Sequence, residues 1–159
     1  MKKKINIQFL IITLLAILTT VSLSIFVFYE LFKQEVMADL KTNTQLLVET
    51  DAWEQIVEKK DAGALDDGVK QLRLTLVDGT GEVILDTNAE VGSMDNHSAR
   101  PEISQALQTG EGQAIRQSST IGKNAFYYAI RLENGSVLRT AKEAGSITSV
   151  FESILPVIV

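Results

Sequence analysis

The residues best suited to chemistry lie in one short stretch, residues 95–102, which contains the chain's single histidine, His97. Arg100 follows it, and Pro101 marks the start of an expected helix. Both the first N–H groups of a helix and a guanidinium favour negative charge, so this stretch is suited to a small anion. We therefore expect residues 95–102 to form the rim of an anion pocket. The competing interpretation is structural: Arg100 pairs with Asp86 or Glu102, and His97 makes only a loop hydrogen bond.

Three further polar residues, Arg116, Tyr128 and Arg139, fall on successive expected strands. A face of a sheet that presents them together would line a pocket. We take Arg116 and Tyr128, with His97 and Arg100, as the candidate ligand contacts. For Tyr128, packing in the core is the stronger alternative.

Nothing in the sequence indicates a catalytic, metal or cofactor site. The chain has no Cys, and no G-x-S-x-G motif provides a nucleophile. A metal site that combines His97 with Asp95 lacks ligand spacing, and the glycine pairs are not followed by G-K-[ST]. The net charge of −5 argues against a nucleic-acid partner.

Hydropathy patterns predict the elements that position these residues. Alternation and turn signals indicate five strands, with the tightest turns at Asp78–Gly81 and Asn134-Gly135. A short helix covers 101–107, with Ser98 as its cap and Gly110 just past its end. The expected strands are 72–77, 82–86, 113–118, 125–132 and 136–142, the first of them half-buried, with a turn at 121–124. The fold class is α+β, a five-stranded antiparallel sheet with helices to one side.

The N-terminal part of the chain has the composition of a membrane helix. Residues 5–29 are 25 consecutive residues without a charge, and about 20 apolar residues suffice to cross a bilayer. No signal-peptidase-like site interrupts the run, so we expect a retained transmembrane helix rather than a signal peptide. Residues 1–4 carry three lysines, whereas residues 30–145 hold 19 acids and 12 bases. The positive-inside rule therefore places residues 1–4 in the cytoplasm and the body outside.

Two more helical segments flank the expected sheet. Residues 30–60 have apolar positions at threes and fours and no Gly or Pro, so we expect one helix, ended by a break at 61–68. Its apolar face packs either on the domain's own sheet or on a second copy. Residues 145–159 repeat the helical period. They form either a short hydrophobic tail or the start of a second, truncated transmembrane segment, and we expect the second.

The order of these motifs resembles the extracytoplasmic segment of PhoR-like bacterial sensor histidine kinases. An Asp-x-x-Gly turn at 78–81 is followed by V-I-L-D-T at 83–87 and by N-H-x-x-R-P-E at 96–102. Further on come E-G-x-x-x-R at 111–116, a Gly122 to Tyr127-Tyr128-Ala129 strand, and Leu138-Arg139. The match covers residues 70–142. It implies a PAS-like or Cache-like sensor domain, which fits the order of two hairpins with a helical insertion.

The resemblance implies the sensing part of a two-component histidine kinase, located in the cell membrane. The phosphoacceptor helix and ATP-binding boxes are absent from these 159 residues, so we expect no catalysis by this chain. The parent would be an ATP-dependent protein histidine kinase that meets its response regulator through its cytoplasmic part. We expect a homodimer, a small anionic ligand and no cofactor. Alternatives are the sensor of a chemoreceptor or cyclic-dinucleotide enzyme, or a membrane-anchored surface binding protein.

Overall fold

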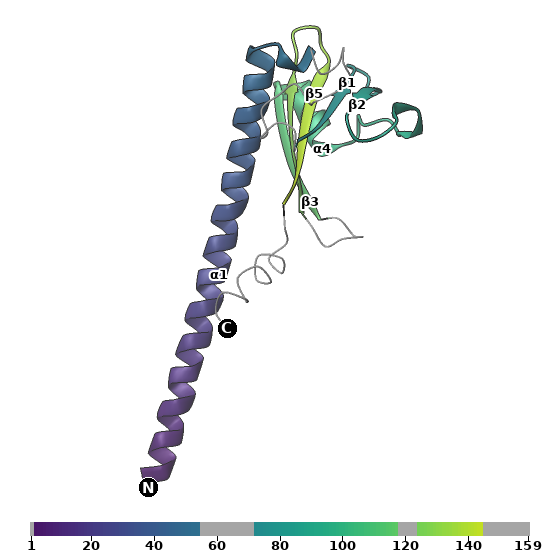
Figure 1. Ribbon diagram of the computed structural model, residues 1–159. Coiled ribbons are helices and arrows are strands. Elements are labelled where there is room, and N and C mark those ends of the chain that lie inside the picture. Colours follow the sequence, from purple (N-terminus) through teal and green to yellow (C-terminus); the bar gives the residue numbers. More distant parts are fainter. Residues whose placement is uncertain (1, 55–71, 118–123, 145–159) are drawn as a thin grey trace. The chain divides into compact units, whose positions relative to one another are not determined.

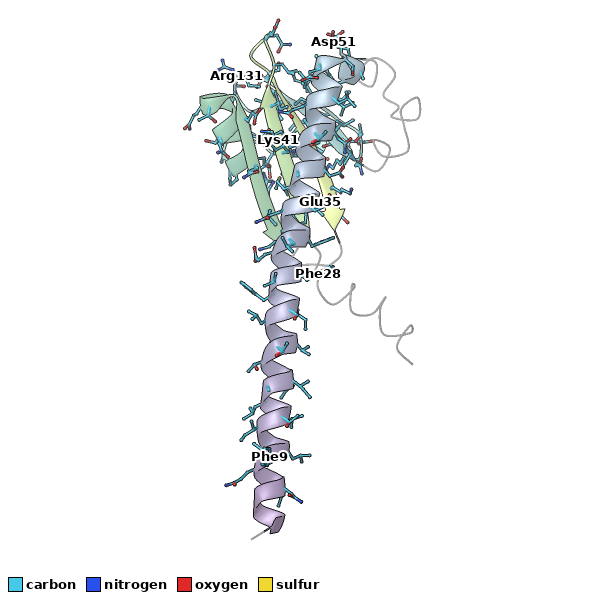
Figure 2. The ribbon with its side chains drawn as sticks, turned by 90° about the vertical axis from the view of Figure 1, so that its left-hand side faces the viewer. Phe9, Phe28, Glu35, Lys41, Asp51 and Arg131 are labelled. Carbon is cyan, nitrogen blue, oxygen red and sulfur yellow. The ribbon has the colours of Figure 1, made fainter. Side chains whose placement is uncertain are left out.

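The computed structural model describes residues 2–54, 72–117 and 124–144, and the chain divides into two compact units, 1–35 and 36–159 (Figure 1). The first unit is the N-terminal part of helix α1 (Lys2–Glu49), whose most apolar window has a mean hydropathy of 2.6 and no buried residues. Phe9 and Phe28 are 68% and 60% exposed and point away from the helix (Figure 2). By length and composition this helix is sufficient to span a membrane, as the sequence predicts.

Helix α1 ends at Glu49, whereas the sequence predicted one helix to residue 60. The chain turns at Asp51, whose φ of 50° is left-handed, and residues 52–54 begin a new helical turn. Aspartate is among the few non-glycine residues that adopt this conformation readily, so no Gly or Pro was needed for the break. Residues 55–60 and the predicted break at 61–68 lie outside the described residues.

Five strands form one antiparallel sheet in the order β2-β1-β5-β4-β3, which confirms the α+β class and the five-stranded sheet. The register pairs β1 with both β2 and β5, so the first strand is central rather than at an edge. Residues 121–123 of the predicted turn and residues 145–159 lie outside the described residues. The strands are β1 (Arg73–Val77), β2 (Val83–Asp86), β3 (Glu111–Gln117), β4 (Asn124–Arg131) and β5 (Val137–Ala144).

The two faces of the sheet are covered by different helices, which corrects the prediction that helices lie to one side. Residues 36–49 of α1 pack on one face, where Leu47 joins a core with Leu74 and Leu138. Helix α4 (Pro101–Thr109) packs on the other face, where Ile103 joins a core with Val77. In Figure 1 the sheet lies to the right of this part of α1, and α4 overlaps the strands in this view. Strand β1 is therefore buried on both sides, not half-buried as predicted.

Helix α4 begins and ends at residues that the sequence partly predicted. Pro101 occupies the first turn and Gly110, with φ of 94°, ends the helix, both as expected. The N-cap is Arg100 rather than Ser98, and it makes no side-chain capping bond. A short 3-10 helix, η2 (Val91–Ser93), precedes this region and was not predicted.

Candidate functional site

The centre of the candidate site is the buried carboxylate of Glu102, in the first turn of α4. Its Oε1 accepts a hydrogen bond from Nη2 of Arg116 at 2.5 Å and lies 3.3 Å from Nη1 of Arg139. Glu102 is fully buried and Arg139 is only 3% exposed. Helix α4 comes this close because strand β3 has a glycine beneath it: a Cβ on Gly112 would lie 2.0 Å from the Glu102 carbonyl oxygen.

A second ion pair extends this network along the same face of the sheet. Nη2 of Arg139 donates to the Thr75 hydroxyl at 2.9 Å, and that hydroxyl donates to Asp86 at 2.7 Å. Asp86 also accepts two bonds of 3.0 Å from Nε of Arg73. Because Asp86, Thr75 and Arg139 are neighbours in the strand register, the pairing itself aligns these groups.

The charges of this buried network do not cancel. Three guanidinium groups, of Arg73, Arg116 and Arg139, face two carboxylates, of Asp86 and Glu102, which leaves one positive charge. Burial lowers the pKa of Arg139, although a guanidinium remains protonated. The Arg73 and Arg116 side chains are 36% and 29% exposed, so water solvates part of this charge and a small anion can reach it from solvent.

Several buried polar atoms in this region have no hydrogen-bond partner among the described residues. They belong to side chains on α4, β3, β5 and the loop before α4. Buried polar groups normally find a partner, so such a group of atoms indicates a place for a polar ligand or water. The atoms are Nδ1 of His97, Oε2 of Glu102, Nε of Arg116 and Nε of Arg139.

His97, in the loop that precedes α4, is buried, with 6% of its surface exposed. Its backbone N–H donates to the Gly81 carbonyl at 2.7 Å, and a Cβ on Gly81 would collide with Ser98. Burial lowers the pKa of His97, and the positive charges of Arg139 and Arg100 lower it further. The imidazole is therefore neutral at pH 7 and lies in a positive field.

Arg100 does not make either of the ion pairs that the structural interpretation offered. Its exposed side chain makes no ion pair with Asp86 or Glu102, since Arg73, Arg116 and Arg139 take those carboxylates among the described residues. Its backbone N–H instead donates to the His97 carbonyl at 2.9 Å, which holds the loop. The Arg100 side chain remains near enough to influence His97, so its candidacy as a ligand contact stands as a prediction.

Tyr128 lies on the other face of the sheet, away from Arg116 and Arg139. Its hydroxyl donates to Glu111 at 2.5 Å, and Lys41 of α1 bonds the same carboxylate at 2.8 Å. Burial, with the bond to Glu111, raises the pKa of Tyr128 to about 12. The structure therefore groups Arg116 with Arg139 and His97, and separates Tyr128 from them. Tyr128 packs in the interface with α1, which is the alternative that the sequence had left open.

Beside the network, on the face that α4 covers, the sheet carries an open hollow of about 310 Å³. Ala141 pairs with Arg73 on one side and with Tyr127 on the other, so the three lie in one row across β1, β5 and β4. The Tyr127 ring lies 4.0 Å from the Arg116 guanidinium and 5.2 Å from that of Arg139. The lining residues are Arg73, Asn88, Ala125, Tyr127, Ala141, Lys142 and Glu143.

The sequence singled out residues 95–102, whose role as a ligand site stays a prediction, and did not group them with the partners on the sheet. It gave Glu102 as a motif residue and a possible partner of Arg100, and it proposed no contact for Arg73, Thr75 or Tyr127. A signal was present: Arg73 and Thr75 occupy alternate positions of an otherwise apolar strand, where polar side chains need partners. No pattern within the sequence reveals that β1 lies beside β5, which brings Thr75 next to Arg139.

The described elements define an α+β domain that follows a helix capable by composition of spanning a membrane. No family model and no curated protein matches the chain. Among solved structures, the chain is similar to the extracellular domain of rpHK1S-Z16, a protein assigned as a histidine kinase. The identity is 15% over 50% of this chain and 32% of that chain, with a TM-score of 0.38.

It is also similar to Bacillus subtilis YkuI, a protein with an EAL domain whose structure is a complex with c-di-GMP and calcium. Here the identity is 13% over 75% of this chain and 36% of that chain, with a TM-score of 0.46. The chain thus spans about a third of each of these proteins. Both similarities are too low to carry an argument about family or function.

Proposed function

We propose that this chain is the membrane-anchored, extracytoplasmic sensing portion of a PhoR-like bacterial two-component histidine kinase, with a PAS-like or Cache-like sensor domain. The observation that carries the proposal is the buried network around Glu102, which has an excess positive charge and unpartnered polar atoms. This network lies where His97 and the N-terminus of α4 meet the sheet, the region that holds the N-H-x-x-R-P-E resemblance. The stimulus is a small anion.

The topology follows from the charges. The apolar part of α1 spans the cell membrane, the lysines at 2–4 stay in the cytoplasm, and the acidic body lies outside. The chain itself catalyses nothing. Phosphotransfer and the contact with a response regulator belong to the cytoplasmic part of the parent kinase.

Helix α1 connects the sensing domain to the membrane and is the path for a signal. Its residues 36–49 contact the sheet by ion pairs as well as by apolar packing. Asp39 pairs with Lys142 of β5 at 3.0 Å, and Lys41 pairs with Glu111 of β3 at 2.8 Å. A ligand that changes the sheet changes these contacts, and it signals if it binds two arrangements with different affinity.

The sensing unit works as a homodimer that uses the exposed side of α1. The side with Leu40 and Leu47 is buried on the sheet, which favours the first of the two interpretations of that seam. The opposite side, which includes Ala38, Thr42 and Leu46, is exposed, and Leu46 is 54% exposed. These residues recur every four positions, so they share one stripe of the helix.

A cysteine scan of the full chain in membranes tests the dimer. Because the sequence has no native Cys, every cross-link reports the introduced residue. Single Cys variants at 38, 42 and 46 are expected to cross-link between copies under mild oxidation. Variants at 40, 44 and 47, whose side chains pack on the sheet, are the matched controls and are expected not to. Equal cross-linking at all six positions, or at none, contradicts the dimer.

The histidine-kinase output is tested by reading the gene beyond codon 159. We expect a second apolar span followed by a phosphoacceptor helix with an H-E-[LI]-[RK]-T-P pattern. A chemoreceptor signalling domain or a cyclic-dinucleotide enzyme domain there assigns the sensor to another receptor type. A stop codon without a cytoplasmic domain makes the chain a surface binding protein.

A further inference from the structure

We propose that the hollow over Ala125 and Ala141 binds a small organic monocarboxylate, with Arg73 as its charged contact. The inference rests on the proposed sensing function and adds the position and the chemical class of the ligand. The site differs from the one that the sequence predicted, because none of His97, Arg100, Arg116 or Tyr128 lines the hollow.

The space exists because alanines occupy positions whose cross-strand neighbours have large side chains. Ala141 lies between Arg73 and Tyr127 in one cross-strand row, and Ala125 lies two residues before Tyr127 on the same face. A methyl group between two long side chains leaves a gap that neither neighbour fills. At about 310 Å³ the hollow is at the lower end of the usual range for ligand pockets, roughly 300–1,000 Å³, so the ligand is small.

The charge of the ligand follows from the charges around the hollow. Arg73 engages Asp86 through Nε, and its terminal nitrogens make no hydrogen bond to any residue of the described ranges. A guanidinium edge of this kind binds a carboxylate with two parallel bonds. Arg73 is therefore the positive group of the hollow that a single negative charge on the ligand can meet.

The lining of the hollow is more polar than apolar, and its carbon surface is limited to two alanine methyl groups and the Tyr127 ring. This small apolar area accommodates a short hydrocarbon portion beside the carboxylate. An inorganic anion leaves this surface wet and gains only the contact with Arg73. Asn88, at the rim, adds a side-chain amide as a polar contact.

Two charged residues of the lining do not change this conclusion. Lys142 turns its ammonium group to the other face of the sheet, where it bonds Asp39 at 3.0 Å. Glu143 is exposed, so water and salt screen its repulsion of an anion. The same carboxylate weakly opposes every negative charge on the ligand, so it opposes a dianion more than a monoanion.

The test is a binding measurement on the full chain in detergent micelles at pH 7. Propionate and benzoate are the probes, propionamide and benzamide are their uncharged counterparts, and sodium chloride keeps the ionic strength equal. We expect one or both carboxylates to raise the unfolding temperature and to bind in calorimetry, while the amides and inorganic phosphate do not. Absence of any effect of both carboxylates, or an equal effect of the amides, overturns the proposal.

Two variants locate the binding site. Arg73→Gln removes the charged contact and is expected to weaken carboxylate binding roughly tenfold or more. Ala125→Leu keeps every charge and fills the hollow, so it must also abolish binding, even if Arg73→Gln fails to fold. Arg131→Gln, an exposed arginine of β4 outside the hollow, is the matched control and is expected to bind normally.

Carboxylate binding that persists in Ala125→Leu overturns the proposed position. These outcomes are independent of the proposed function, because the cross-linking scan and the downstream gene sequence test the sensor without any ligand. Failure of carboxylate binding with success of those two tests leaves a sensor with a different ligand.

Discussion

The hydroxyl oxygens of Thr44 and Thr140 lie 2.6 Å apart in the interface between α1 and strand β5. Both residues are fully buried. The Thr44 hydroxyl also lies 2.6 Å from the Leu40 carbonyl oxygen, so one hydroxyl can donate to that carbonyl while the other donates across the interface. The contact between helix and sheet therefore includes one buried hydrogen bond. This directional bond fixes the position of the helix along the sheet, whereas the packing of leucines alone would permit several positions.

This hydroxyl pair makes a prediction about stability. Thr140→Val is expected to lower the free energy of unfolding by about 1 kcal/mol, the usual net value of one hydrogen bond. The double variant Thr44→Val/Thr140→Val is expected to lose less than the sum of the two single variants, because neither hydroxyl is then left alone. Urea unfolding of the full chain in micelles measures this cycle. Thr42→Val, at an exposed position, is the control, and strictly additive losses would count against the bond.

The second prediction concerns the stability that the Glu102 carboxylate contributes. Glu102→Gln leaves the buried guanidinium of Arg139 and the partly exposed one of Arg116 without their anion, and the expected loss of stability is about 3 kcal/mol. Glu111→Gln is the matched control, since Glu111 also binds a cation and a neighbour but at a solvent-exposed position. Its expected loss is below about 1 kcal/mol. Similar losses in the two variants, measured by urea unfolding, would show that the ion pairs of Glu102 contribute no more to stability than an exposed ion pair does.

Much of the fold could be predicted because it depends on local signals. Alternation located all five strands within a few residues, and Pro101 and Gly110 bounded α4. The end of α1 could not be predicted, because it rests on a left-handed Asp51 that the surrounding residues impose. The placement of helices on both faces was also missed, since burial on two sides of β1 requires knowledge of its neighbours.

The candidate site was predictable only in its loop. His97 could be selected because it is the single histidine, whereas its burial and its neighbour Arg139, from a strand more than forty residues away, could not be predicted. Tyr128 was misplaced relative to Arg116 because the two occupy opposite faces of paired strands. If the pairing of β3 with β4 were shifted by one residue, Tyr128 and Arg116 would lie on the same face of the sheet.

Gly112 makes the third prediction, which concerns the approach of α4 to the sheet. In Gly112→Ala the new Cβ would lie 2.0 Å from the Glu102 carbonyl oxygen, so α4 must move away. We expect a loss of about 3 kcal/mol, together with exposure of the arginine network. Gly92→Ala is the control, because a Cβ there meets nothing within 4 Å. Equal unfolding temperatures for both variants would mean that α4 does not rest on β3 as described.

The last prediction concerns pH and begins from the neutral, buried His97. Burial, Arg139 and Arg100 all lower its pKa in the folded protein below the ordinary 6.5. Above pH 6.5 both folded and unfolded chains carry a neutral imidazole, so the residue then adds no pH dependence. As the pH falls below 6.5, only the unfolded chain takes up the proton, and the folded state loses stability until its own lower pKa is reached.

We therefore expect the wild-type chain to lose stability between pH 6.5 and 5 by at most about 1.4 kcal/mol per pH unit from this residue. His97→Gln cannot be protonated, so it lacks this part of the loss, while the acidic residues contribute equally to both chains. The difference between the two chains in urea unfolding at pH 7.5, 6.5, 5.5 and 5 isolates the effect of His97. It should be constant above pH 6.5 and shift in favour of the variant below it. A shift in the opposite direction would mean that the folded protein stabilises the imidazolium, and that the field around His97 is negative rather than positive.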